Sequence, residues 1–192
     1  MAVTVSVGTL VGLVAGFYGG KVDAVLMRLT DALMCFPTVF LLLVLVAFVG
    51  MSVFTITLII GLTAWMELAR ILRNQTMALR ERDFVHAARA LGASDSRIIF
   101  QHLLPNSLAP ILVAATLNIA NAVLAESYIS YLGYGIQPPA ASWGNMLNNS
   151  QSYFGAAPWV AIFPGLLITL TVTGFNFVGD GLRDALDPRS RR

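Results

Sequence analysis

The chain has 192 residues, of which 57% are hydrophobic and only 11% are charged, and its formal net charge is +2. Soluble domains carry roughly 25% charged residues, so this composition excludes a water-soluble globule and indicates a polytopic membrane protein. The single cysteine, Cys35, excludes an intrachain disulfide and a cysteine-based metal cluster, and redox chemistry is therefore not expected.

Apolar stretches along the chain predict an all-α fold, a polytopic bundle of membrane-spanning helices. Each span needs about 20 mostly apolar residues to cross a hydrocarbon core of roughly 30 Å. The predicted spans are residues 2–17, 33–50, 53–66, 108–125 and 159–178. The remaining residues are connecting segments, so we expect no second globular domain.

The first span carries three glycines at four-residue intervals, Gly8, Gly12 and Gly16. They form a stripe without side chains on one side of the helix, where another backbone can approach closely. We therefore expect helix packing here rather than a ligand site. Pro37 and Pro164 each remove a backbone donor, which predicts kinks in the second and fifth spans.

The basic residues follow only the first, third and fifth spans. The turn near Gly50 and the segment 126–158 contain none. Because cytoplasmic loops collect Lys and Arg, this pattern predicts that residues 67–107 and the C-terminus lie in the cytoplasm and that residues 126–158 lie outside. The basic residues are Lys21, Arg28, Arg70, Arg73, Arg80, Arg82, Arg89, Arg97, Arg183, Arg189, Arg191 and Arg192.

The same orientation places the start of the chain outside the membrane, within an apolar run that has no basic residue to orient it. We therefore expect that one more N-terminal span, with its charged flank, is missing from this sequence. The alternative is a genuine five-span protein with an external N-terminus.

Residues 67–107 are too many for a simple turn and too few for a domain. We expect the third span to continue as a helix past the headgroups through Glu67, Arg70, Arg73 and Arg80. Attraction to anionic lipid is the favoured interpretation of Arg70 and Arg73, ahead of contact with a partner.

A short helix is predicted next, from Asp83 to Leu91. Asp83 is a suitable N-cap, the alanines favour a helix, and Gly92 can adopt the left-handed conformation that ends it. Isolated helices below about 12 residues are marginal, so other contacts have to hold this one. The small Ala87 and Ala88 suit insertion into a groove on another protein, and an amphipathic helix on the membrane surface is the alternative.

A further helix is expected from Ser94 to Leu104, and Pro105 is expected to break it before the fourth span. His86 and His102 are the two histidines of the chain. Two such ligands without a Cys or carboxylate at a suitable spacing do not indicate a metal site, so structural or interfacial roles are favoured.

At this point the sequence resembles a known family. The run His86-Ala-Ala-Arg-Ala-Leu-Gly92, followed after nine residues by His102-Leu-Leu-Pro105, is similar to the cytoplasmic signature of permease subunits of bacterial ABC importers. Gln137-Pro-Pro, Trp143-Gly-Asn-Met-Leu and the segment from Asn176 to Pro188 resemble the dipeptide, oligopeptide and nickel group, in particular its second ("C") subunit. The resemblance covers essentially the whole chain.

The sequence departs from this family in two ways. His86 stands where the family has Glu, so the polar contact of that carboxylate is in doubt. Family members are also longer at the N-terminus by about one span and an external segment, which agrees with the expectation from the charges.

The resemblance implies a multi-pass subunit of the bacterial cytoplasmic (inner) membrane, with residues 1–192 as one permease domain. It implies two cytoplasmic ATPase subunits, a second similar permease subunit, an external solute-binding protein docked on segments that include 126–158, and membrane lipid around the spans; no nucleic acid is expected. The implied coupling residues are Phe84, His86, Ala87, Ala88, Leu91, Gly92, Leu104 and Pro105.

The chain itself is not expected to be an enzyme or to bind a cofactor. A phosphate-binding loop needs Gly, four residues, Gly-Lys and Ser/Thr, whereas the only lysine, Lys21, has Ala15 at the first glycine position and Val22 at the last. ATP and Mg would therefore bind to the partner ATPases.

The cargo and the residues that bind it are not identified by the sequence. Peptides are the leading cargo, and nickel or another small solute is the alternative. A non-transporting structural subunit or inactive fragment is the rival from another class. An intramembrane enzyme is disfavoured, because the spans hold neither a Ser/His nor an Asp/Asp arrangement.

Overall fold

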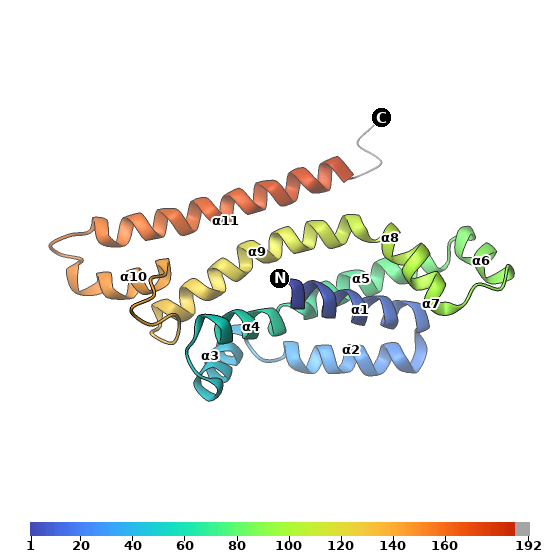
Figure 1. Cartoon of the computed structure of the whole chain (residues 1–192), viewed down its shortest axis with the longest axis horizontal. Coiled ribbons are helices and arrows are strands. Elements are labelled where there is room, and N and C mark those ends of the chain that lie inside the picture. The colour runs from blue at the N-terminus through green and yellow to red at the C-terminus, as the bar shows by residue number, and fades with distance from the viewer. Residues whose placement is uncertain (187–192) are drawn as a thin grey trace. The chain divides into compact units, whose positions relative to one another are not determined.

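The computed structural model describes residues 1–186, which contain helices and no strand, so the predicted all-α class is confirmed (Figure 1). Residues 187–192, with the last two positions of the motif that ends at Pro188, lie outside the described part. The α-helices are α1 Ala2–Tyr18, α2 Gly20–Met34, α3 Thr38–Val49, α4 Val53–Thr63, α5 Trp65–Arg80, α6 Asp83–Ala90, α7 Asp95–Arg97, α8 Leu104–Asn106, α9 Leu108–Tyr131, α10 Trp143–Ser150 and α11 Trp159–Leu186. A π-helix, η1, covers Ile98–Leu103, and a 3-10 helix, η2, covers Gln151–Tyr153.

Within residues 1–186, three helices are long and apolar enough to cross a membrane: Val53–Arg80, Leu108–Tyr131 and Trp159–Leu186. The first joins α4 and α5, so the third predicted span does continue as a helix to Arg80. A fourth span exists if α2 and α3 together count as one broken span, and α1, with 17 residues, is apolar but shorter. The membrane bundle is thus confirmed, and the count of five spans is not.

The prediction of one span over residues 33–50 is not confirmed as a single continuous helix. Helix α2 ends at Met34, Pro37 is the N-cap of α3, and the residues between them are not helical. The backbone nitrogen of an N-cap residue makes no hydrogen bond within its helix, so the missing N–H of Pro37 costs nothing there. The proline therefore lies at a break between two helices and not inside one helix. The 12 residues of α3 rise only about 18 Å, well short of a roughly 30 Å core.

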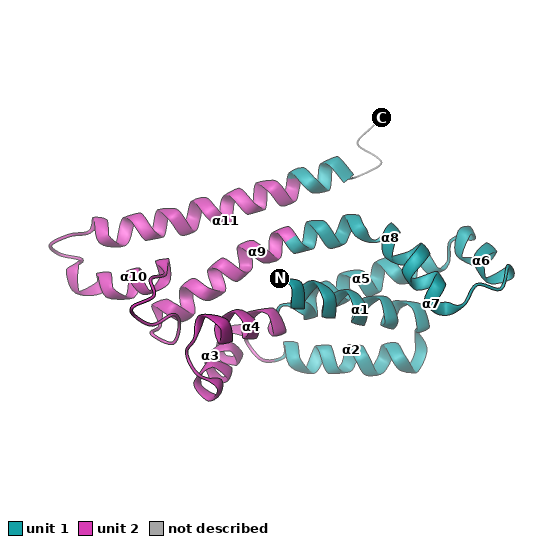
Figure 2. Cartoon of the chain, viewed as in Figure 1, with its two compact units in different colours: residues 1–35, 64–115, 181–192 teal, residues 36–63, 116–180 magenta. Residues whose placement is uncertain are grey.

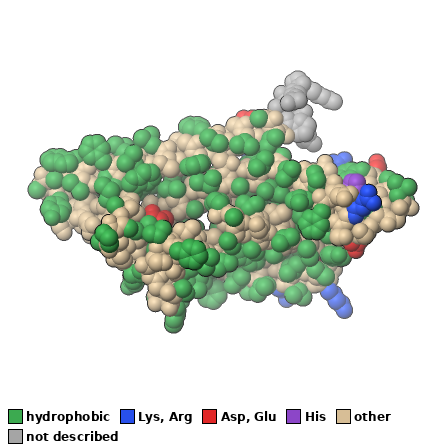
Figure 3. Space-filling model, viewed as in Figure 1, with side chains coloured by type: hydrophobic (Ala, Val, Ile, Leu, Met, Phe, Trp, Pro, Cys, Tyr) green, Lys and Arg blue, Asp and Glu red, His purple; other side chains and the backbone are tan. Residues whose placement is uncertain are grey.

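The chain forms two compact units, each with its own core (Figure 2). Unit 1 comprises residues 1–35, 64–115 and those from 181 onwards, and unit 2 comprises residues 36–63 and 116–180. Every Lys and Arg among residues 1–186 belongs to unit 1. On the face shown in Figure 3, the blue Lys and Arg side chains are accordingly confined to unit 1 elements, and hydrophobic side chains predominate elsewhere.

Within unit 1, the glycine stripe of α1 lies directly against the backbone of α5, which confirms the expected helix packing and identifies the partner helix. A Cβ atom placed on Gly8, Gly12 or Gly16 would lie 2.9, 2.7 or 2.6 Å from the carbonyl oxygens of Trp65, Ala69 and Arg73, respectively. Real Cβ atoms do not approach that closely, so only glycine permits this separation of the two helices.

We predict that Gly12→Ala lowers the thermal stability of the purified protein, because the new methyl group overlaps the Ala69 carbonyl and the Leu72 side chain. The expected loss is about 1–3 kcal/mol, the range for overpacked sites. Gly174→Ala is the matched control, since that helical glycine has open space around it. It should raise stability by about 0.5–1 kcal/mol. Equal shifts in melting temperature for the two variants would contradict the packing argument.

Candidate functional site

Helix α6, with its exposed side and buried side, is the centre of the candidate site. Val85 is fully buried and Ala88, three residues later, is 9% exposed, so these two residues face the core of unit 1. Phe84, His86 and Ala87 are exposed. The sequence treated Ala87 and Ala88 as one small-residue pair, but the structure separates them: Ala88 packs inward and Ala87 faces outward.

A buried apolar cluster holds this short helix in place. Five further buried residues pack with Val85 and Ala88: Leu13 and Phe17 of α1 and Ile98, Ile99 and Leu103 of η1. An eight-residue helix is marginal by itself, so these contacts supply the support that the sequence analysis required. The cluster also joins α6 to α1, a contact between segments about 70 residues apart that no local sequence pattern indicated.

Gly92 ends α6 in the way the sequence predicted. Its φ is +78°, in the left-handed region that glycine adopts without strain. The Gly92 amide donates to the Arg89 carbonyl at 2.9 Å, and the Ala93 amide donates to the Ala88 carbonyl at 3.0 Å. This pair of bonds is a Schellman motif, and Ala93 packs against the same apolar cluster, so the exit direction of the chain is fixed.

The other end of α6 differs from the prediction by one residue. Arg82 is the N-cap, with an extended backbone, and Asp83 is the first helical residue. No side chain caps this end, because the aspartate lies inside the first turn, where its charge favourably opposes the helix dipole instead.

The return towards α9 is helical beyond the predicted break. Pro105 does not stop the helix at Leu104, because a π-helix precedes it and the proline occupies the first turn of α8, which ends at Asn106. The side-chain Nδ2 of Asn106 donates to the His102 carbonyl at 2.7 Å. Leu104 packs against the cluster beneath α6 and against a second buried cluster of unit 1, whereas Pro105 is exposed. The second cluster consists of Leu68, Leu72, Ile111 and Ala114.

The predicted coupling residues therefore divide into two groups. An exposed group lies mostly on the surface of α6 and its end, where Leu91 is 88% and Phe84 39% exposed, and includes one residue of α8. A supporting group lies beneath or behind it, and the Phe84 ring approaches the His102 ring with centroids 6.5 Å apart. The exposed residues are Phe84, His86, Ala87, Leu91, Gly92 and Pro105, and the supporting ones are Ala88 and Leu104.

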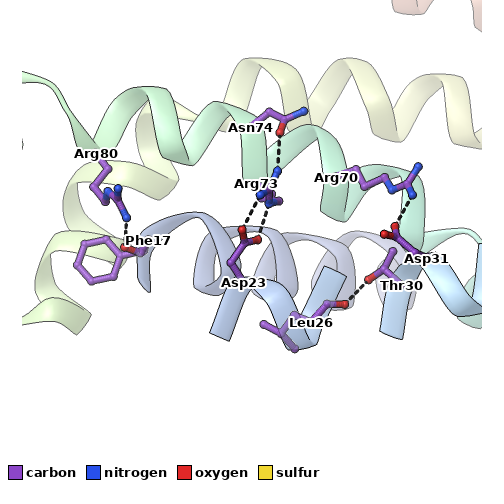
Figure 4. Close-up of polar contacts among 9 residues, drawn as sticks. All are labelled: Phe17, Asp23, Leu26, Thr30, Asp31, Arg70, Arg73, Asn74 and Arg80. Carbon is purple, nitrogen blue, oxygen red and sulfur yellow. Dashed lines mark hydrogen bonds and ion pairs between the residues drawn. The ribbon is translucent and has the colours of Figure 1, made fainter. Parts of the chain in front are cut away.

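Two arginines of α5 form ion pairs with carboxylates of α2 (Figure 4). Arg70 pairs with Asp31, and Arg73 pairs through two of its nitrogens with Asp23. The interpretation of these arginines as lipid contacts did not include these partners. The available signal was the presence of two acids on α2 and of arginines on α5: Asp23 and Asp31 meet Arg73 and Arg70 in reverse order, as antiparallel packing requires.

The motifs after α9 form local structure within unit 2. Ser142 and Asn145 make a capping box that starts α10, and the side-chain Nδ2 of Asn148 donates to the Tyr131 carbonyl at 2.6 Å. Gln137 donates to the carbonyl of Gly133 at 2.9 Å. Polar residues at these positions thus shape the segment between α9 and α10.

Comparison with known proteins gives a consistent family. Residues 8–192 match the family described as "Binding-protein-dependent transport system inner membrane component". The chain is 42% identical to the oligopeptide transport system permease protein OppC of Haemophilus influenzae, over 98% of this chain and 61% of that protein. It is 44% identical to the dipeptide transport system permease protein DppC of Alkalihalophilus pseudofirmus, over 96% of this chain and 60% of that protein. It is 40% identical to OppC of Bacillus subtilis, over 97% and 61%. The chain thus spans about three-fifths of the length of these relatives.

We predict that Asp23→Asn destabilises the protein more than Asp31→Asn does. The Asp23–Arg73 pair is mostly buried, with 14% and 28% of the side chains exposed, against 52% and 46% for Asp31–Arg70. Loss of the buried carboxylate should cost about 1–3 kcal/mol, and loss of the exposed one less than about 1 kcal/mol. Thermal unfolding in detergent at low and high salt measures both. Equal losses, or a larger loss for Asp31→Asn, would show that burial does not set the strength of these pairs.

Proposed function

The chain belongs to the family of binding-protein-dependent transport system inner membrane components, and we propose that it is a transmembrane subunit of an ABC importer that carries peptides. The names of the relatives, which are permease proteins of oligopeptide and dipeptide transport systems, support this cargo. The observation that carries the proposal is the exposed surface of α6, held rigidly over a buried cluster.

The exposed surface of α6 combines apolar and small side chains, as helices that insert into grooves of other proteins do. Phe84 and Leu91 are apolar and exposed at its two ends, and the small Ala87 between them lets another backbone come close. Apolar side chains that project this far into water favour a covering partner. We propose that the groove belongs to a cytoplasmic ATPase subunit, with a second ATPase serving a second, similar permease subunit.

ATP and Mg bind on these ATPases in the proposed mechanism, and the chain supplies no catalytic group. Closure of the ATPases on ATP shifts α6, and Val85 and Ala88 carry the shift into the core of unit 1 because they are buried there. The spans then exchange between inward-open and outward-open arrangements. ATP drives this exchange only by the difference in its binding free energy between the two arrangements.

The proposed orientation places α6 and the C-terminus in the cytoplasm and residues 126–158 outside, where an external solute-binding protein docks. The distribution of charge supports it: every described Lys and Arg lies in unit 1 and the segment 126–158 has none. The proposed membrane is the bacterial inner membrane, and the words "inner membrane component" in the family description support this location.

The direct test is reconstitution of the full-length protein with its ATPases, its second permease and its binding protein in proteoliposomes. Uptake of radiolabelled di- and oligopeptides should require ATP and the binding protein. Uptake of nickel without peptide uptake would overturn the cargo assignment. A complex that assembles and hydrolyses ATP but transports neither solute would make this chain a structural subunit.

We predict that Gly92→Val reduces ATP-dependent uptake by at least about tenfold, because a β-branched residue is strained at φ +78° and disrupts the Schellman motif. Gly92→Asn is the matched variant, since Asn tolerates the left-handed region, and it should retain most of the uptake. Membrane insertion, measured by the amount of protein in the membrane fraction, should be unchanged in both. Normal uptake by Gly92→Val would contradict the coupling role of this turn.

A further inference from the structure

Two arginines from different helices hold the last turn of α1. The Phe17 carbonyl accepts a hydrogen bond from Nη1 of Arg80 on α5, at 3.1 Å (Figure 4). The guanidinium carbon of Arg89 on α6 lies 5.2 Å from the centroid of the Phe17 ring, within the range of a cation–π contact. The ring itself is only 3% exposed, so its position is fixed by the surrounding cluster.

The chain reverses direction immediately after this turn. Gly19, which separates α1 from α2, and Gly20, the first residue of α2, both have positive φ, at +64° and +52°. A Cβ on Gly19 would lie 3.0 Å from Nη1 of Arg80. The end of α1 is therefore anchored from the side by α5 and α6, while a glycine pair joins it to α2.

Arg89 and Arg97, the next arginine along the chain, make different kinds of contact. The described contact of Arg89 is with an aromatic ring of another helix, whereas Arg97 bonds Gln101 within its own helical segment, at 3.0 Å. Arg89 is thus positioned to carry a displacement of α6 to α1. Because the glycine stripe packs α1 against α5 along its length, the displacement reaches both helices together.

We propose that Arg89 is a positioning residue that links α6 to α1 through the Phe17 ring, so that movement of α6 by the ATPases becomes movement of the α1–α5 pair. This inference rests on the proposed importer function. It concerns the efficiency of coupling, because Arg89 touches neither the cargo nor ATP in this scheme.

The test uses the complete reconstituted importer and measures peptide molecules transported per ATP hydrolysed. Arg89→Gln keeps a polar side chain but removes the cation, and it should lower this ratio by about tenfold while ATP hydrolysis continues. Arg89→Lys keeps a cation over the ring and should stay within about twofold of the parent protein. Arg97→Gln is the matched control, and its ratio should not change.

A double-mutant cycle identifies the partner of Arg89. Phe17→Leu keeps an apolar side chain in the cluster but removes the ring, and it should lower the ratio as Arg89→Gln does. If the two residues act through one contact, the double variant should be no worse than either single variant. Additive losses, or an unchanged ratio in Arg89→Gln, would overturn the inference. Failure of the parent complex to take up peptide would instead refute the proposed function, so the two failures are distinguishable.

Discussion

The close packing of α1 against α5 is the constraint on which the rest of unit 1 depends. Three glycines bring the two backbones nearer than any side chain would permit, and this places the last turn of α1 beside Arg80. Leu13 and Phe17, from the same half of α1, then complete the cluster beneath α6. A wider separation would open that cluster, and the eight-residue α6 would lose the contacts that make it stable.

The ion pairs of unit 1 solve a related problem for α2. This helix carries Asp23 and Asp31, whose charges are costly beside apolar spans. Two arginines of α5 form ion pairs with these aspartates, so α2 is bound to the same helix that packs against α1. Helix α5 therefore serves as the common support, with glycines joining it to α1 and charges joining it to α2. Apolar packing alone would leave α2 free to slide along its neighbours, because apolar contacts are not directional.

Structural features that depend on neighbouring residues in the sequence were predictable, whereas contacts between segments far apart in the sequence were not. Gly92 was identified correctly as the end of α6, since its conformation depends on a few neighbouring residues. Pro37 was identified as a point where the chain bends, but the complete break between α2 and α3 was not predicted, because hydropathy is continuous across it. Pro105 was read as a helix stop, although the preceding π-helix accommodates it. The support of α6 by Phe17 was missed entirely, because no periodicity links residues so far apart.

The division of α6 into a buried pair and an exposed surface also explains why a substitution at His86 is compatible with the fold. His86 lies on the exposed side, so a histidine where the resemblance to the family implies Glu contributes neither to the apolar cluster nor to the Schellman turn. Val85 and Ala88 carry the packing, and their small volumes leave room for the Phe17 ring and η1. Residues on the exposed side are therefore free to match a partner, whereas those on the buried side must fit one fixed core. In the proposed importer, the identity of residue 86 would bear on recognition of the ATPase, and the identity of residues 85 and 88 on whether movement of α6 reaches the core of unit 1.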